Sequence, residues 1–247
     1  MQSGRRQRIL NALAVTAGSA LVWLASPDLA WPARLMTVFL LVIMPGLLLV
    51  QGRMANRVPE GLNRNELYIS SVVSIWILAA VTMAAAWASG FTVRLLGLSG
   101  HTPARLLLAG ALTTAIGLGA MIVGRLLRLP ETALLKFLLP RTGGERLMFL
   151  GVALSAGIAE ELVFRSFLIP ALQAATDSVW LAVALSSSAF GLIHSYQGAS
   201  GALRASFLGL LLALPFVATG SVLPSMGAHA ALDIIGGLWL GDWMLRR

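Results

Sequence analysis

Eight long apolar runs, separated by short charged or Pro- and Gly-containing stretches, constrain the fold of this chain of 247 residues more than any other feature. A helix that crosses a bilayer needs about 20 apolar residues. Lipid offers the backbone no hydrogen-bond partners, and the runs lack the strict alternation of a membrane barrel, so we expect each run to be a helix. The runs are residues 9–25, 35–51, 67–91, 104–124, 147–170, 178–196, 203–220 and 223–245.

Composition excludes a soluble globular protein. Hydrophobic residues make up 57% of the chain and charged residues only 11%, whereas soluble domains carry about 25% charged residues. A soluble chain of this size could not bury so much apolar surface in one core. We therefore predict an all-α, polytopic transmembrane helix bundle of about eight spans, with residues 1–247 forming a single integral membrane domain.

The positions of the basic residues predict the orientation of the bundle. Of the 18 Lys and Arg residues, 14 lie at the two ends of the chain or in the connections after the second, fourth and sixth runs. The opposite side carries Arg34, Arg94 and Arg105, while Arg165 lies inside the fifth run. Because cytoplasmic loops are enriched in Lys and Arg, both termini should be cytoplasmic. The net charge of +8 then reflects membrane topology, and we expect no nucleic-acid partner.

The first run follows three arginines and resembles a signal peptide, but its possible cleavage positions lack the small residues that cleavage requires. It is therefore predicted to be an uncleaved first span. Nearly all the basic residues are arginine, with Lys136 as the one lysine, a bias typical of GC-rich coding. We expect a multi-pass protein of the cell membrane, the inner membrane of a bacterium.

The longest connection divides the chain into two groups of four spans. Residues 1–124 form the four N-terminal spans and residues 147–245 form a four-span core. Between them, residues 125–146 alternate leucine and phenylalanine with cationic positions, a pattern typical of a helix that lies in the cytoplasmic interface. A gate for a substrate is the alternative interpretation of this segment.

Polar residues gather in the second half, where charged side chains within spans are costly and mark candidate functional sites. They lie in three of the last four runs, which predicts one shared polar site. The six residues are Glu160, Glu161 and Arg165 in the fifth run, His194 in the sixth, and His229 and Asp233 in the eighth.

Helical spacing in the fifth run separates the two glutamates. Glu161 and Arg165 are four residues apart and of opposite charge, which favours a salt bridge within the helix. Glu160 has no such partner and must find one on another span or become neutral. Gly157, one turn earlier, would allow a neighbouring helix to approach closely.

The same spacing rule places Phe190 with His194, and His229 with Asp233, on shared helix faces. On the predicted boundaries, however, the two histidines lie near opposite ends of their spans. At about 1.5 Å per residue they can meet only if these spans are short, tilted or broken. The residues that could provide breaks are Gly198, Gly201, Pro215 and Pro224.

Two imidazoles with several carboxyl groups are typical of sites that activate water. A carboxylate can deprotonate a water that an imidazole holds, while other donors stabilise the oxyanion that forms at a carbonyl. A buried ion network that only holds the bundle together is the alternative. The chain has no cysteine, which excludes thiolate catalysis and zinc sites built from cysteine.

The order EExxxR, FxxxH and HxxxD, each motif on a separate late span, resembles the CPBP intramembrane proteases. This is the Abi family of CAAX proteases and bacteriocin-processing enzymes, which includes the type II CAAX prenyl endopeptidases. The resemblance covers about residues 145–240. The matching residues are Glu160, Glu161 and Arg165, then Phe190 and His194, then His229 and Asp233.

The resemblance implies an intramembrane endopeptidase that acts on membrane-anchored or lipid-modified protein substrates. It implies that Glu160 is the general base, that His194 helps to hold the attacking water, and that His229 and Asp233 polarise the scissile carbonyl. An ionised Asp233 would repel an oxyanion, so Asp233 would be protonated or would fix the tautomer of His229. The supporting residues would be Glu161, Arg165 and Phe190.

The cofactor and the substrate stay open at this stage. We expect a glutamate-type enzyme that requires no cofactor, and a zinc ion held by Glu160, His194 and His229 is the alternative. A prenylated C-terminus, a bacteriocin leader or a sorting-tag tail would each suit a membrane-embedded site.

Three other functions compete with this hypothesis. The GxSG sequence at residues 198–201 would suit a rhomboid-like serine protease with Ser200 as nucleophile and His229 as base, but it leaves the glutamates unexplained. The buried Glu, His and Asp residues could form the relay of a proton-coupled transporter, but their confinement to one half of the chain is unlike an inverted repeat. A non-catalytic scaffold is the third.

Overall fold

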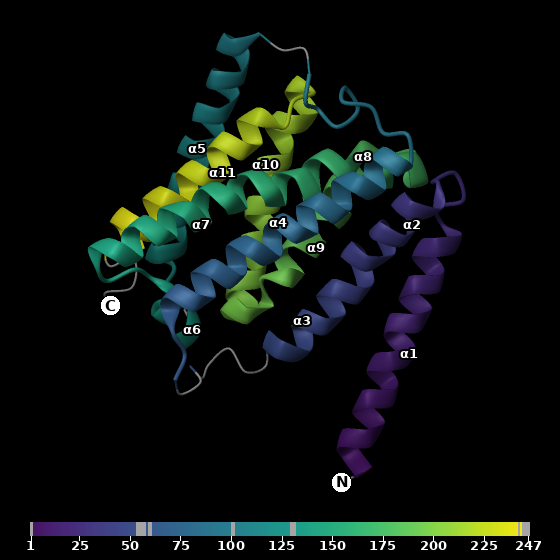
Figure 1. The fold of residues 1–247 in the computed structure, drawn as a ribbon, viewed down its shortest axis with the longest axis horizontal. Helices are drawn as coiled ribbons and strands as arrows, with labels where there is room; N and C mark the ends of the chain where they lie inside the picture. Colours follow the sequence, from purple (N-terminus) through teal and green to yellow (C-terminus); the bar gives the residue numbers. More distant parts are fainter. Residues whose placement is uncertain are drawn as a thin grey trace.

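A computed structural model of the protein describes residues 2–52, 58, 61–99, 102–128, 132–241 and 243. Every regular element within these residues is helical (Figure 1), as the sequence predicted. Four of the basic residues used to predict the orientation, Arg53, Arg57, Arg246 and Arg247, lie outside the described residues.

The first half contains four long helical segments. The second of them is continuous through a short π-helical turn, η1 (Phe39–Ile43), which joins α2 to α3. Asn63 caps the third, because its side chain accepts a hydrogen bond from the Asn65 amide at 2.9 Å. The α-helices are α1 (Gln2–Leu24), α2 (Trp31–Val38), α3 (Met44–Gly52), α4 (Arg64–Ala88) and α5 (Pro103–Leu126).

The second half begins with a short helix, α6 (Ala133–Leu138), and continues with one helical segment of 34 residues, 143–176. A reciprocal capping box of Thr142 and Glu145 fixes the start of that segment. The segment comprises α7 (Gly143–Glu161), the π-helical turn η2 (Leu162–Leu168) and α8 (Ile169–Thr176). The remaining elements are α9 (Val179–Ile193), η3 (Ser195–Gln197), α10 (Gly198–Thr219), α11 (Leu223–Ile234) and η4 (Ile235–Leu240).

Five helices in the described part of the chain are long and apolar enough to cross a membrane, judged by length and composition. Two shorter apolar helices, Asn11–Leu24 and Val179–Ile193, accompany them. The fold class of a multi-pass helical membrane protein is therefore confirmed, whereas eight spans and cytoplasmic termini stay predictions. The five helices are Trp31–Leu49, Arg64–Ala88, Pro103–Leu126, Gly143–Thr176 and Ser195–Thr219.

Helix α7 lies along α4 on one side and along α11 on the other (Figure 1). Helix α9 packs between α8 and α10, and the buried side chains concentrate where η2 meets α9. Large apolar side chains such as Leu107, Leu147 and Leu203 are instead more than 70% exposed on the outside of the bundle. That inversion is what a helix bundle in lipid requires, since its outer surface contacts hydrocarbon.

The connection between the two halves is fastened to the beginning of α4. The Arg64 side chain donates to the Phe137 carbonyl at 2.6 Å and forms an ion pair with Glu145 at 2.5 Å. The Tyr68 hydroxyl donates to the Leu138 carbonyl at 2.6 Å. These contacts hold α6 against α4 and against the beginning of α7. Placement of residues 125–146 in the cytoplasmic interface stays a prediction.

Candidate functional site

The centre of the site is the carboxylate of Glu161, the last residue of α7. Its Oε1 atom accepts one hydrogen bond from Arg165 Nη1 at 2.9 Å and another from His229 Nδ1 at 2.8 Å. All three residues are at most 3% exposed. The predicted pairing of Glu161 with Arg165 is confirmed, and the structure adds His229 from α11 as a third member.

The π-helical turn η2 begins directly after Glu161 and carries Arg165. A π-helical turn inserts one residue into the regular ladder of an α-helix, and such turns are frequent at functional sites. Arg165 also donates from Nη2 to the Gly209 carbonyl of α10 at 3.1 Å. Its guanidinium therefore connects the glutamate helix to α10 as well as neutralising Glu161.

Gly157 brings α11 close enough to α7 for His229 to reach Glu161. A Cβ atom at this position would lie 2.7 Å from both the backbone nitrogen and the Cβ atom of Ala230. Real Cβ atoms do not come that close to a backbone, so only glycine fits. The prediction that Gly157 permits close approach of a neighbouring helix is confirmed.

Glu160 and Asp233 lie on the other side of the His229 ring. The Nε2 atom of His229 is 3.9 Å from Glu160 Oε2 and 3.7 Å from Asp233 Oδ2, beyond direct hydrogen-bond distance. The Glu160 side chain is 15% exposed and that of Asp233 is 34% exposed. Glu160 thus finds its neighbour on another helix, as predicted, and it is more accessible than Glu161.

His194 follows the last residue of α9 and approaches the site through Phe190. The Nδ1 atom of His194 donates to the Phe190 carbonyl at 2.7 Å. The Phe190 ring lies 4.6 Å from the His194 ring and 5.8 Å from the His229 ring, centroid to centroid. It also lies 4.6 Å from the guanidinium carbon of Arg165, a cation–π contact. Phe190 is therefore the common neighbour of both histidines.

The brevity of α9 explains how two histidines predicted near opposite ends of their spans come to share one aromatic neighbour. The predicted run of residues 178–196 contains a helix of only 15 residues, which ends at Ile193. Pro215 lies inside α10 without ending it, and Pro224 is the second residue of α11. The short α9, rather than a span broken at Pro215, lets both histidines contact Phe190.

Glu161, and not Asp233, is placed to fix the tautomer of His229. The carboxylate of Glu161 can only accept, so the proton of this hydrogen bond resides on Nδ1. The Phe190 carbonyl likewise places a proton on Nδ1 of His194. Both rings therefore keep Nε2 for other partners. Asp233 lies nearest Nε2 of the ring, at 3.7 Å, and its predicted role stays a prediction.

Among the described residues, no group of three or more His, Cys, Asp or Glu side chains is arranged to hold a metal ion. Glu160, His194 and His229 are all described residues and are included in that statement. The choice between a metal-free enzyme and a zinc enzyme stays a prediction.

The GxSG sequence forms the first turn of α10, where Gly198 has a φ of +80°.

A carboxylate beside two oriented imidazoles can move a proton and stabilise a developing negative charge. Glu160 can accept a proton, and Nε2 of neutral His194 can accept a hydrogen bond from water. Nε2 of His229 can donate when the ring is doubly protonated. Three carboxylates around His229 are the partners that such a cation requires.

Residues 142–235 match the family model described as type II CAAX prenyl endopeptidase Rce1-like. The matched segment contains every site residue named above, from Glu160 to Asp233, and it is the part of the chain that resembles the CAAX proteases. Comparison with curated proteins and with solved structures gives no match. Residues 142–235 are therefore similar to the Rce1-like type II CAAX prenyl endopeptidases, in agreement with the resemblance to the CAAX protease family that the motifs indicate.

Proposed function

We propose that the protein is an intramembrane endopeptidase that hydrolyses a peptide bond in a membrane-anchored, prenylated protein, with Glu160 as general base. One observation carries the proposal. In the Rce1-like segment of an otherwise apolar bundle, His229 of α11 lies between a buried carboxylate that orients it and two accessible carboxylates. A purely structural ion pair needs Glu161 and Arg165 but leaves Glu160 and Asp233 without a purpose.

Glu160 is the better base of the two adjacent glutamates. Glu161 is fully buried and already accepts from Arg165 and His229. Glu160 is partly exposed and no hydrogen bond to its carboxylate is found among the described residues. It can therefore receive a proton from a water, and that water can be held by Nε2 of His194.

The reaction balances with these groups alone. The oxygen of the water attacks the scissile carbonyl carbon while its proton passes to Glu160. The carbonyl oxygen becomes an oxyanion, and Nε2–H of His229 with protonated Asp233 donates to it. Glu160 then returns the proton to the departing amine as the carbon–nitrogen bond breaks. Glu161 and Arg165 act as positioning residues for His229.

The substrate class follows from the family and from the surroundings of the site. Type II CAAX prenyl endopeptidases, as their name states, act on prenylated CAAX sequences. The outer surface of this bundle is apolar, so a lipid-modified chain end can reach it by diffusion in the membrane. A prenyl group would hold the peptide at the depth where Glu160 and His229 lie.

The test compares two synthetic peptides of identical sequence, one farnesylated on its cysteine and one unmodified, with purified protein in liposomes. We expect cleavage of the farnesylated peptide on the amino side of the last three residues, detected by mass spectrometry. Treatment with a chelator should leave the rate unchanged. Equal cleavage of both peptides would overturn the substrate class. Loss of activity on chelation, restored by Zn²⁺, would overturn the metal-free mechanism.

A further inference from the structure

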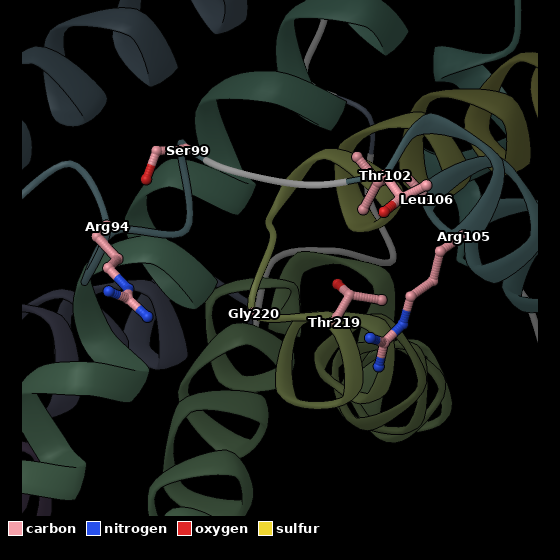
Figure 2. Close-up of a pocket in the computed structure, with 7 residues that line it drawn as sticks. All are labelled: Arg94, Ser99, Thr102, Arg105, Leu106, Thr219 and Gly220. Atoms are coloured by element: carbon pink, nitrogen blue, oxygen red, sulfur yellow. The ribbon is translucent and has the colours of Figure 1, made fainter.

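Two adjoining cavities lie away from the catalytic groups, where the connection from α4 to α5 meets the turn between α10 and α11. The first has a volume of about 630 Å³ and the second about 590 Å³, and both are lined by Arg94 and Gly220. Figure 2 shows Arg94 and Arg105 on either side of the turn formed by Thr219 and Gly220. None of these residues belongs to the site of Glu160 and His229.

The first cavity is polar and cationic. Besides the two arginines, it is lined by the hydroxyl-bearing residues Ser99, Thr102 and Thr219. Thr102 precedes α5 and its side chain makes no capping hydrogen bond, so its hydroxyl does not occupy an amide of the first turn of α5. Among the residues that the structure describes, no acidic side chain lines the cavity. This lining suits an anion with several oxygen atoms, such as a phosphate.

The second cavity is mainly apolar and continues from the first. Its lining combines Arg94 and its neighbours in the α4–α5 connection with residues of three helices, α8, α9 and α10. The apolar lining residues are Leu95, Ile169, Val179, Phe216 and Val217. A ligand that fills both cavities needs an anionic head and an apolar chain.

The loop that carries Arg94 is held in place by the rest of the structure. The Val222 amide donates to the Gly97 carbonyl at 3.1 Å, and Gly97 has a φ of +69°. A Cβ atom at Gly97 would lie 2.7 Å from the Phe216 ring. Phe91 of the same loop packs against Phe167 with ring centroids 5.5 Å apart. The cavity is thus a built feature of the fold.

Arg105 is positioned from the other side. It donates from Nη2 to the Ala218 carbonyl at 2.6 Å, which leaves its remaining donors for a ligand. Arg94 and Arg105 are two of the three basic residues that the topology prediction places on the side opposite the cytoplasm. Basic residues are sparse on that side, so two of them around one cavity indicate a specific use of their charge.

The geometry points to a binding site for an anionic phospholipid, with the phosphate between Arg94 and Arg105 and one acyl chain along the apolar cavity. The cavities lie where helices end, at the level of the membrane that lipid phosphates occupy if the predicted spans hold. This site is independent of the proposed protease activity.

The experiment uses the purified full-length protein in detergent and native mass spectrometry to count bound lipids. The probes are phosphatidylglycerol, zwitterionic phosphatidylcholine, inorganic phosphate and glycerophosphoglycerol, which is the headgroup without chains. We expect phosphatidylglycerol to bind in preference to phosphatidylcholine and to be displaced by neither soluble compound. The double variant Arg94→Gln/Arg105→Gln should lose about tenfold of that affinity, as expected for a lost charge-assisted contact.

Arg34→Gln is the matched control, because Arg34 is the third basic residue on the same predicted side and lies outside both cavities. The Arg34→Gln variant should keep the preference for phosphatidylglycerol over phosphatidylcholine. The single variant Arg94→Gln tests the same site if the double variant misfolds, because Arg94 is exposed and its substitution should leave the fold intact. Equal binding of the two lipids, an equal loss in Arg34→Gln, or displacement by inorganic phosphate would each overturn the lipid site. The last outcome would assign the cavity to a free anion.

Discussion

Glu160 and Glu161 are neighbours in sequence but have different environments in the structure. Adjacent residues of an α-helix point about 100° apart, so the carboxylate of Glu161 is buried while that of Glu160 is partly exposed and lies near His229. Glu161 accepts two hydrogen bonds from charged or ring nitrogens and is fully buried. The same residue type therefore orients a histidine at one position and, in the proposed mechanism, exchanges a proton at the next.

We predict opposite profiles for the two glutamine variants. Glu161→Gln leaves Arg165 as an uncompensated buried charge, a loss of about 3–5 kcal/mol, so its melting temperature in detergent should fall clearly. Glu160→Gln should melt close to the wild type but cleave poorly. Both quantities can be measured on the same preparations. A larger loss of thermal stability for Glu160→Gln would contradict the assigned roles.

Asp233 gives a second prediction at the scale of a single residue. Its carboxyl group lies 3.7 Å from Nε2 of His229, and a protonated carboxyl can be replaced as a donor by an amide N–H. Asp233→Asn should therefore cleave within about tenfold of the wild type, whereas Asp233→Leu should lose about 100-fold, as when an oxyanion donor is removed. Initial rates of peptide cleavage by the two variants and the wild type test this prediction. Equal loss in the two variants would exclude the donor role.

The helices position these residues through one close contact and one irregular turn. Gly157 lets α11 approach α7, and η2 turns Arg165 beneath Glu161 and towards α10. The contact between α7 and α11 carries the hydrogen bond from His229 to Glu161. The geometry of the candidate site and the packing of α7 against α11 therefore depend on the same surface.

Gly157→Ala should disturb both the packing of α11 against α7 and the geometry of the site. The added Cβ atom would overlap the backbone of Ala230, and overpacking of this kind costs about 1–3 kcal/mol. The melting temperature and the cleavage rate should both decrease. Gly151→Ala is the matched control on α7, because a Cβ atom there would meet nothing within 4 Å. A harmless Gly157→Ala variant would show that α11 does not need this close approach.

Spacing within a helix could be predicted from sequence, but contacts between helices could not. The pairs of Glu161 with Arg165, of Phe190 with His194, and of His229 with Asp233 each follow from a four-residue interval. The hydrogen bond between His229 and Glu161 joins residues 68 positions apart, and no pattern within one helix specifies it. The motifs placed both residues in one site, and Gly157 indicated only that some helix would approach.

Element boundaries show where hydropathy is insufficient. The predicted run 147–170 corresponds to a helical segment of residues 143–176, and the run 178–196 to a helix of 15 residues. Apolar composition does not mark where a helix ends when the next residues are equally apolar. Hydropathy does not mark the π-helical turn η2 either, because its residues, such as Phe164 and Phe167, are as apolar and buried as those of a regular helix in the core.

At the scale of the whole molecule, the distribution of basic residues predicts eight spans with both termini cytoplasmic. The chain has no cysteine, so single cysteines can be introduced without background. Lys136→Cys should react with a membrane-impermeant thiol reagent only from the cytoplasmic side, and Ser99→Cys only from the opposite side. Both positions are exposed. Labelling of both from one side would refute the predicted topology.

In the proposed mechanism, a lipid-anchored chain end reaches the apolar bundle through the membrane and meets water at the polar site of Glu160 and His229. The most direct test of that account is the cleavage rate of Glu160→Ala on the farnesylated peptide in liposomes, with Glu66→Ala on the exposed face of α4 as control. We predict a loss of at least about 100-fold for Glu160→Ala, the contribution of a general base, with an unchanged melting temperature and a normal rate for Glu66→Ala. Cleavage by correctly folded Glu160→Ala at the wild-type rate would contradict the account.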